Sequence, residues 1–103
     1  MKPLGTHNYW VYITTNLQRT VLYVGMTNDL DRRLWEHEQD SKTDKRTFAG
    51  KYKCFNLVYM EWHLYVNDAI YREKELKGWA RARKNALIEV ENADWKFLNS
   101  NLG

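Results

Sequence analysis

The stretch WVYITTNLQRTVLYVGMTNDLDRRLWEH, residues 10–37, decides the predicted fold. It contains two short runs rich in aromatic and β-branched residues, 8–14 (NYWVYIT) and 21–25 (VLYVG), and both predict strands. The mostly polar residues between the runs predict a hairpin turn. Segment 27–29 (TND) then supplies capping side-chain oxygens, and a helix is expected to follow to about residue 39.

The hairpin places two tyrosines on one face of the predicted sheet. If residues 16–19 form a four-residue loop, Tyr12 lies directly opposite Tyr23 in the antiparallel register. In that register Gly25 lies opposite Trp10, where the missing side chain allows another group to approach closely.

One face of the first helix combines apolar and polar side chains. At 3.6 residues per turn, a single arc of about 100° contains Leu30, Arg33, Leu34 and His37. Glu36 points the other way. Surface residues without a role would be expected on the opposite side, so we predict that Arg33 and His37 share the face that meets the core.

The later segments complete an α+β fold. They are assigned in chain order as a loop at 40–53 with a helical turn around 47–52, followed by a strand at 57–62. A helix capped by Asn67 or Asp68 then runs to about Lys77, where Gly78 ends or bends it. The last assignments are a basic helix at 80–90, a turn at 92–95 and a short helical end at 96–98. The predicted fold is a small three-stranded antiparallel sheet flanked by helices in the order β-β-α-β-α-α. It forms one domain over residues 8–98, with short terminal segments at 1–7 and 99–103.

The second helix carries a carboxylate within its apolar stripe. The residues that share this arc are Ala69, Glu73, Leu76 and Ala80, whereas Glu75 faces away. A carboxylate in such a stripe is unfavourable unless it is paired, protonated or bound to a cation. An ion pair with an arginine inside the fold and a functional carboxylate are both open interpretations of Glu73.

Composition and charge narrow the function only slightly. The 103 residues carry 16 Lys and Arg against 13 Asp and Glu, a net charge of +3. Residues 72–84 are locally basic, which suits a nucleic-acid backbone, although a solvated helix face is the more frequent explanation. A single cysteine, Cys54, excludes an internal disulfide and fits a reducing compartment. Segment 1–7 lacks the apolar core of a signal peptide, and no apolar run approaches the ~18–20 residues of a membrane span, so we expect a cytoplasmic protein without a membrane partner.

Taken together, the motifs resemble the GIY-YIG endonuclease superfamily, especially its small stand-alone bacterial members. Trp10-Val11-Tyr12 stands where the family has Gly-Ile-Tyr, and Tyr23-Val24-Gly25 is a variant of Tyr-Ile-Gly. Arg33 follows at the family's spacing, and Glu73 lies in a later helix. The resemblance covers almost the whole chain, from about Asn8 to Leu98.

The resemblance implies hydrolysis of DNA phosphodiester bonds with one Mg²⁺ or Mn²⁺ ion, in DNA repair, recombination or related processing. By the same resemblance Glu73 would be the metal ligand, and Arg33 would bind the scissile phosphate. Tyr12 and Tyr23 would flank the attacking water, and His37 would assist the attack. A single protein carboxylate implies that the metal ion is held weakly without substrate.

DNA is therefore the expected partner. The residues predicted to contact it outside the catalytic set are Gly25, Lys77, Arg81, Arg83, Lys84 and Asn92. The chain has no room for a separate recognition domain, so we expect it to recognise DNA structure or backbone, or to obtain specificity from a protein partner or a homodimer.

Two other functions stay open from the residues alone. One is a non-catalytic nucleic-acid-binding module on the same fold, and the other is a protein-interaction domain with a polar core network. In the second case Tyr12 and Tyr23 would be an ordinary cross-strand aromatic pair. Arg33 and Glu73 would then form a buried ion pair without chemistry.

Overall fold

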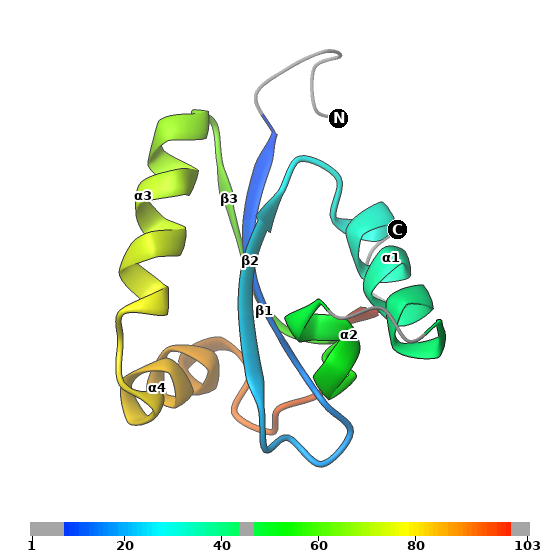
Figure 1. Ribbon diagram of the computed structural model, residues 1–103. Coiled ribbons are helices and arrows are strands. Elements are labelled where there is room, and N and C mark those ends of the chain that lie inside the picture. The colour runs from blue at the N-terminus through cyan, green and yellow to red at the C-terminus, as the bar shows by residue number, and fades with distance from the viewer. Residues whose placement is uncertain (1–7, 44–46, 100–103) are drawn as a thin grey trace.

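A three-stranded antiparallel sheet separates two layers of helices in the computed structural model, which describes residues 8–43 and 47–99 (Figure 1). The strands lie in the order β2-β1-β3 and are β1 (Tyr9–Thr15), β2 (Leu22–Thr27) and β3 (Asn56–His63). One face of the sheet is covered by α1 (Leu30–Lys42) and α2 (Phe48–Tyr52), and the other by α3 (Val66–Lys77) and α4 (Arg81–Glu91). The predicted α+β fold is confirmed, and the helical turn expected around 47–52 is α2.

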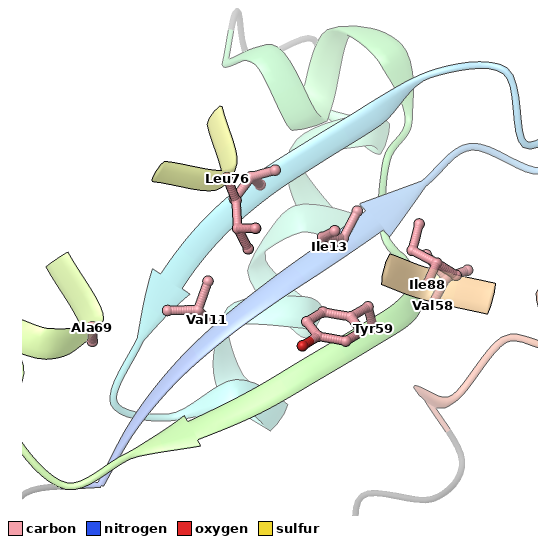
Figure 2. Close-up of a cluster of buried hydrophobic side chains, with 8 residues drawn as sticks. Val11, Ile13, Val58, Tyr59, Ala69, Leu76 and Ile88 are labelled. Atoms are coloured by element: carbon pink, nitrogen blue, oxygen red, sulfur yellow. The ribbon is translucent and has the colours of Figure 1, made fainter. Parts of the chain in front are cut away.

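Each face of the sheet has its own apolar cluster, because side chains alternate between the faces along a strand. The buried members of the cluster beneath α3 and α4 are Val11, Ile13, Val24, Val58, Tyr59, Ala69, Leu76 and Ile88 (Figure 2). Those beneath α1 are Tyr12, Leu30, Leu34 and Leu57. The second cluster therefore contains a phenol hydroxyl as well as apolar groups.

The register between β1 and β2 differs from the predicted one. Gly25 pairs with Tyr12 and not with Trp10, so the prediction is wrong by two residues on β1. Tyr12 and Tyr23 are diagonal neighbours instead of direct partners. They still share a face, because a shift of two residues preserves the alternation of side chains. The cause is the connecting loop, which spans residues 16–21.

The side chain of Asn16 closes this longer loop. Its Oδ1 accepts hydrogen bonds from the backbone N–H groups of Thr20 (2.8 Å) and Val21 (3.0 Å), and its Nδ2 donates to Thr20 Oγ1 (2.7 Å). Arg19 turns the chain with a left-handed φ of 60°. Asparagine side chains replace backbone hydrogen bonds in turns in this way, and the loop can therefore be longer than the tight turn we predicted.

The helix ends agree with the prediction in part. Asp29 caps α1 through its side chain, as expected. α3 begins earlier than predicted, with Tyr65 at its N-cap, so Asn67 and Asp68 lie inside the first turn. Asp68 lies in the first turn, where the positive end of the helix dipole favours an acidic residue. A first-turn residue and a cap have similar preferences for acidic side chains, and Asp68 was therefore predicted as a possible cap. The helix ends at Gly78, as predicted.

The apolar stripe of α3 is confirmed for two residues. Ala69 and Leu76 are fully buried. Ala80 lies outside this helix, as the N-cap of α4, because the chain turns at Gly78. No helix among the described residues is long and apolar enough to cross a membrane.

The segment after α4 runs beside β3. The helical end predicted at 96–98 is not formed. Instead, the Leu98 N–H donates to the Leu57 carbonyl (2.7 Å). The Asn99 side chain accepts from the Leu57 N–H (2.8 Å) and donates to the Phe55 carbonyl (2.9 Å). Pairing with the sheet edge replaces the intrahelical bonds that we had expected.

Candidate active site

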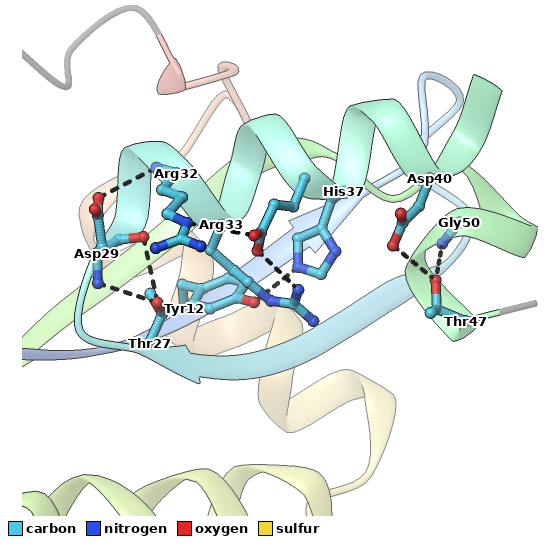
Figure 3. A network of polar contacts seen from close by, with 10 residues as sticks. Tyr12, Thr27, Asp29, Arg32, Arg33, His37, Asp40, Thr47 and Gly50 are labelled. Atoms are coloured by element: carbon cyan, nitrogen blue, oxygen red, sulfur yellow. Dashed lines mark hydrogen bonds and ion pairs between the residues drawn. The ribbon is translucent and has the colours of Figure 1, made fainter. Parts of the chain in front are cut away.

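Tyr12 and His37 form the buried centre of the candidate site. The Tyr12 hydroxyl and His37 Nε2 are 2.8 Å apart, and the two side chains are 0% and 1% exposed (Figure 3). His37 comes from α1, whose Leu30 and Leu34 pack against the sheet and fix the orientation of the helix. The predicted inward direction of His37 is confirmed.

Burial keeps both groups of this pair uncharged at neutral pH. Loss of solvent raises the pKa of the Tyr12 hydroxyl, and the positive charge of Arg33 offsets this increase only in part. Burial, together with the charge of Arg33, lowers the pKa of His37 to about 4. His37 Nδ1 has no hydrogen-bond partner within the described chain. Because Tyr12 and His37 are both uncharged, the hydrogen bond between the Tyr12 oxygen and His37 Nε2 contains a single proton.

Tyr23 lies between this pair and the protein surface. Its ring centroid is 6.2 Å from that of Tyr12 and 5.2 Å from that of His37, which it meets edge-on. On its other side Phe48 of α2 stacks at 5.8 Å with an interplanar angle of 28°. Sequence patterns did not indicate Phe48, because a single aromatic residue in a polar segment has no periodicity.

Gly25 makes room for the two tyrosines. A Cβ atom at this position would lie 2.5 Å from the Tyr12 hydroxyl and 2.8 Å from a ring carbon of Tyr23. Both distances are too short for any side chain other than hydrogen. The open space predicted at Gly25 is therefore filled by the tyrosine rings, and the direct contact with DNA expected there is not supported.

Arg33 lies at the solvent border beside the phenols. Its side chain is 34% exposed, and its Nη1 is 3.2 Å from Glu36 Oε1 (Figure 3). Burial acts to lower the pKa of Arg33, but hydrogen bonds to Glu36, Tyr12 and Tyr23 raise it overall. The guanidinium is thus held near both tyrosines by a partner that is itself accessible to solvent.

Glu73 approaches the same region from α3. Its carboxylate is 3.5 Å from Lys77 Nζ, and its side chain is 22% exposed. Its negative charge is one of the causes that raise the pKa of Tyr12. Among the described residues Glu73 pairs with Lys77 and Arg33 pairs with Glu36, so the pair between an arginine and Glu73 that we considered is not seen there.

Comparison with known proteins identifies the family. The family model described as the GIY-YIG catalytic domain matches residues 8–86. The chain belongs to the GIY-YIG family. This family is a nuclease superfamily, and its domain includes every element that carries the tyrosines, the arginine, the histidine and the glutamate described above.

Small bacterial proteins are similar to this GIY-YIG chain over most of their length. A UPF0213 protein of Bacillus pumilus (strain SAFR-032) is 34% identical over 83 residues, which are 81% of each chain. The solution NMR structure of a UPF0213 protein from Bacillus halodurans has a TM-score of 0.55 and 28% identity, covering 90% of this chain and 93% of that chain. These relatives share the single-domain form of the GIY-YIG fold.

Two of the basic residues expected to contact DNA have contacts within the GIY-YIG domain. Arg81 donates to the backbone carbonyls of Thr20 (2.8 Å) and Arg19 (3.1 Å), and so joins α4 to the β1–β2 loop. The guanidinium of Arg83 lies 3.9 Å from the centre of the Trp79 ring.

The other two basic residues are close to the candidate site. Lys77 and Lys84 line a surface hollow together with Tyr23 and Phe48. The four basic residues therefore divide into a pair with structural contacts and a pair beside the GIY-YIG tyrosines.

Asn92 is a buried residue at the end of α4. It is 8% exposed, and its Nδ2 donates to the carbonyls of Val58 (3.0 Å) and Lys96 (2.9 Å). Its Oδ1 accepts from the Lys96 N–H (2.9 Å). The expected contact with DNA is not supported here, because the amide holds the C-terminal segment against β3.

Within residues 8–43 and 47–99 of this GIY-YIG chain, no group of three or more His, Cys, Asp or Glu side chains could hold a metal ion. Glu73 is the carboxylate whose charge acts on Tyr12, and a metal ion bound by it would have few protein ligands.

Proposed function

We propose that the protein is a metal-dependent DNA endonuclease that hydrolyses phosphodiester bonds in DNA repair, recombination or related DNA processing. The main support is that side chains from both faces of the sheet converge beside β2. This set comprises Tyr12, Tyr23, Arg33, His37 and Glu73.

In this proposal Arg33 binds the scissile phosphate. A phosphodiester is already anionic, so attack by water requires positive charge on its non-bridging oxygens. The planar guanidinium can contact two of these oxygens at once. Its present partner, Glu36, is 34% exposed, and a solvent-screened ion pair of this kind opens at small cost.

Tyr12 and His37 are suited to remove the proton of the attacking water. Tyr12 is fully covered in the absence of DNA, with Arg33 beside its hydroxyl, so the proposal requires that movement of Arg33 to the phosphate lets water reach that group. The Tyr12 oxygen then accepts the water proton while its own proton moves to His37 Nε2, 2.8 Å away. At neutral pH His37 is unprotonated, and movement of Arg33 to the phosphate would remove one of the two causes that lower its pKa, so that the imidazole becomes a better proton acceptor when DNA is bound.

Glu73 fits the role of a single ligand for Mg²⁺ or Mn²⁺. Hard cations prefer oxygen ligands and commonly use one or two carboxylates, with water and substrate phosphate completing the coordination. When bound, the ion would neutralise charge that develops on the phosphate. The ammonium of Lys77, 3.5 Å from the carboxylate, must give way to the cation, which is consistent with weak binding in the absence of DNA.

A nuclease assay with matched variants tests the proposal. Wild type is expected to cut at least one of single-stranded, duplex or branched DNA in Mg²⁺ or Mn²⁺. Arg33→Ala and Glu73→Gln should each reduce the rate by about 10²-fold or more, since each removes charge stabilisation. Glu75→Gln, on a neighbouring position of α3, should retain activity.

The remaining outcomes separate the rival functions. Equal cleavage by wild type and Glu73→Gln would mean that the site is elsewhere or the preparation is contaminated. Salt-sensitive DNA binding without cleavage would support a non-catalytic nucleic-acid-binding module. The absence of both would support a protein-interaction domain.

A further inference from the structure

A row of aromatic rings leads from the candidate site onto the protein surface. Phe48 stacks on Tyr23, and Tyr52 follows with its ring centroid 4.8 Å from that of Phe48. Phe48 and Tyr52 are 48% and 41% exposed. Both rings belong to α2, which lies beside β2 on the same face of the sheet as α1 (Figure 1).

Contacts other than these two exposed rings also hold α2 in place. Ala49 is 1% exposed and provides the buried contact of this short helix. Thr47 caps its first turn through a hydrogen bond from the Gly50 N–H (3.0 Å), and the Cys54 N–H donates to the Ala49 carbonyl (2.9 Å). These contacts do not require aromatic side chains at positions 48 and 52.

Two hollows flank the aromatic row, and their charged lining residues are all lysines. The first is lined by Leu22, Tyr23, Val24, Phe48, Lys77 and Lys84. The second lies at the far end of the row, where Tyr52 meets Lys53 and Phe55. The ammonium of Lys51 adds to this charge, 5.3 Å from the centre of the Tyr52 ring. Positive charge thus flanks the aromatic row on both sides.

We propose that this surface binds a single-stranded segment of DNA beside the scissile phosphate. Unpaired bases can stack on exposed aromatic rings, whatever their sequence, and lysines neutralise the phosphates between them. Bases inside a duplex stack on each other and cannot offer their faces in this way. Phe48 and Tyr52 therefore favour DNA with unpaired nucleotides over continuous duplex. The inference rests on the proposed endonuclease for its biological setting, but the binding itself needs no cleavage.

Binding measurements in EDTA test this inference separately from catalysis. Fluorescence anisotropy with a labelled thymidine oligonucleotide and with a duplex of equal length should show tighter binding of the single strand. Phe48→Leu and Tyr52→Leu keep apolar side chains but remove the aromatic faces, and each should weaken single-strand binding by about tenfold. Phe48→Tyr, which keeps a ring, should bind as wild type does.

Matched controls separate stacking from general effects. Tyr71→Leu removes a tyrosine of α3 that is 71% exposed, and should leave binding unchanged. Lys84→Gln alters charge without altering a ring, and should reduce the slope of log affinity against log salt concentration by about one. It therefore tests the same surface even if a ring variant does not fold, which circular dichroism would detect.

Two results would overturn the inference. One is equal affinity of wild type for single strand and duplex, and the other is unchanged affinity in both leucine variants. Cleavage of duplex without single-strand preference would reject this inference and retain the endonuclease. Ring-dependent single-strand binding without cleavage in any metal would support this inference and reject the endonuclease.

Discussion

His37 couples the chemistry of the candidate site to the stability of the fold. Its pKa is about 4 in the folded protein, below the ordinary value of 6.5, because burial disfavours the charged imidazole. Between these pH values the unfolded chain binds a proton that the folded chain does not. The contribution of His37 is therefore fully present above pH 6.5 and is lost as the pH falls towards 4, by an amount on the order of 3 kcal/mol.

Urea unfolding between pH 7 and pH 4 measures this effect. Wild type should lose free energy of unfolding over that range more steeply than His37→Gln, which carries no titrating group at the position. His63→Gln removes a partly exposed imidazole on β3 and should follow the wild-type slope more closely. Parallel curves for wild type and His37→Gln would contradict the assignment of a buried neutral imidazole.

Gly25 has an equally specific role at the scale of one residue. A Cβ here would lie 2.5 Å from the hydroxyl of the fully buried Tyr12, so one of the two groups must shift. Gly25→Ala is expected to reduce the free energy of unfolding by about 1–3 kcal/mol and to disturb the contact with His37. Near-ultraviolet circular dichroism and urea unfolding would detect both changes.

Gly78 provides the matched comparison for Gly25. Its φ is −80°, and an added Cβ would meet nothing closer than a backbone oxygen at 3.5 Å. Gly78→Ala should therefore be neutral or stabilise the fold by about 0.4–1 kcal/mol. Similar losses in the two variants would show that helix or strand propensity, and not the tyrosine contact, determines the effect at Gly25.

At the scale of secondary-structure elements, α3 presents a carboxylate whose partner competes with a cation. Lys77→Gln removes the ammonium 3.5 Å from Glu73 and is expected to tighten Mn²⁺ binding by up to about fivefold, the value of an exposed ion pair. Isothermal titration calorimetry would measure it. Lys74→Gln, on the exposed side of the same helix, should have a smaller effect, and Glu73→Gln should abolish binding. Equal affinities for both lysine variants would show that Lys77 does not compete.

The sequence predicted the elements better than their connections. The inward face of α1 followed from helical spacing, because Leu30 and Leu34 must pack on the sheet and carry His37 with them. The register of β1 and β2 was wrong because it depends on Asn16, whose side chain supplies loop hydrogen bonds that no periodicity reveals. For the same reason the buried hydrogen bonds of Asn92 could not be foreseen, since they join segments distant in sequence.

At the scale of the whole molecule, the candidate site is assembled from both layers of helices around the edge strand β2. Family motifs predicted the residue types of this site, but the sequence did not show that α2 adds Phe48 to the tyrosines. That contact depends on where a five-residue helix packs, and the packing is set by Ala49 and Thr47 in a mostly polar segment. The contact of Phe48 with the tyrosines therefore depends on tertiary packing, which sequence motifs and their spacing do not reveal.

A proposed metal site with a single protein carboxylate predicts that the fold does not require the metal ion. Because Glu73 is the one protein carboxylate proposed to bind it, 5 mM Mg²⁺ without DNA should raise the thermal midpoint by less than about 2 °C. EDTA should have an equally small effect. Differential scanning calorimetry of wild type and Glu73→Gln provides the comparison. A large decrease in EDTA would reveal a structural metal site and would contradict the proposed ligand set.

The short segment that follows α4 covers part of an exposed edge of the sheet. β3 lies at the edge of the sheet, and edge strands with free backbone groups can pair with strands of another molecule and begin aggregation. Leu98 and Asn99 occupy the backbone N–H and carbonyl of Leu57 and the carbonyl of Phe55. A few residues beside one end of β3 thus occupy the backbone groups with which a strand of another molecule would pair there.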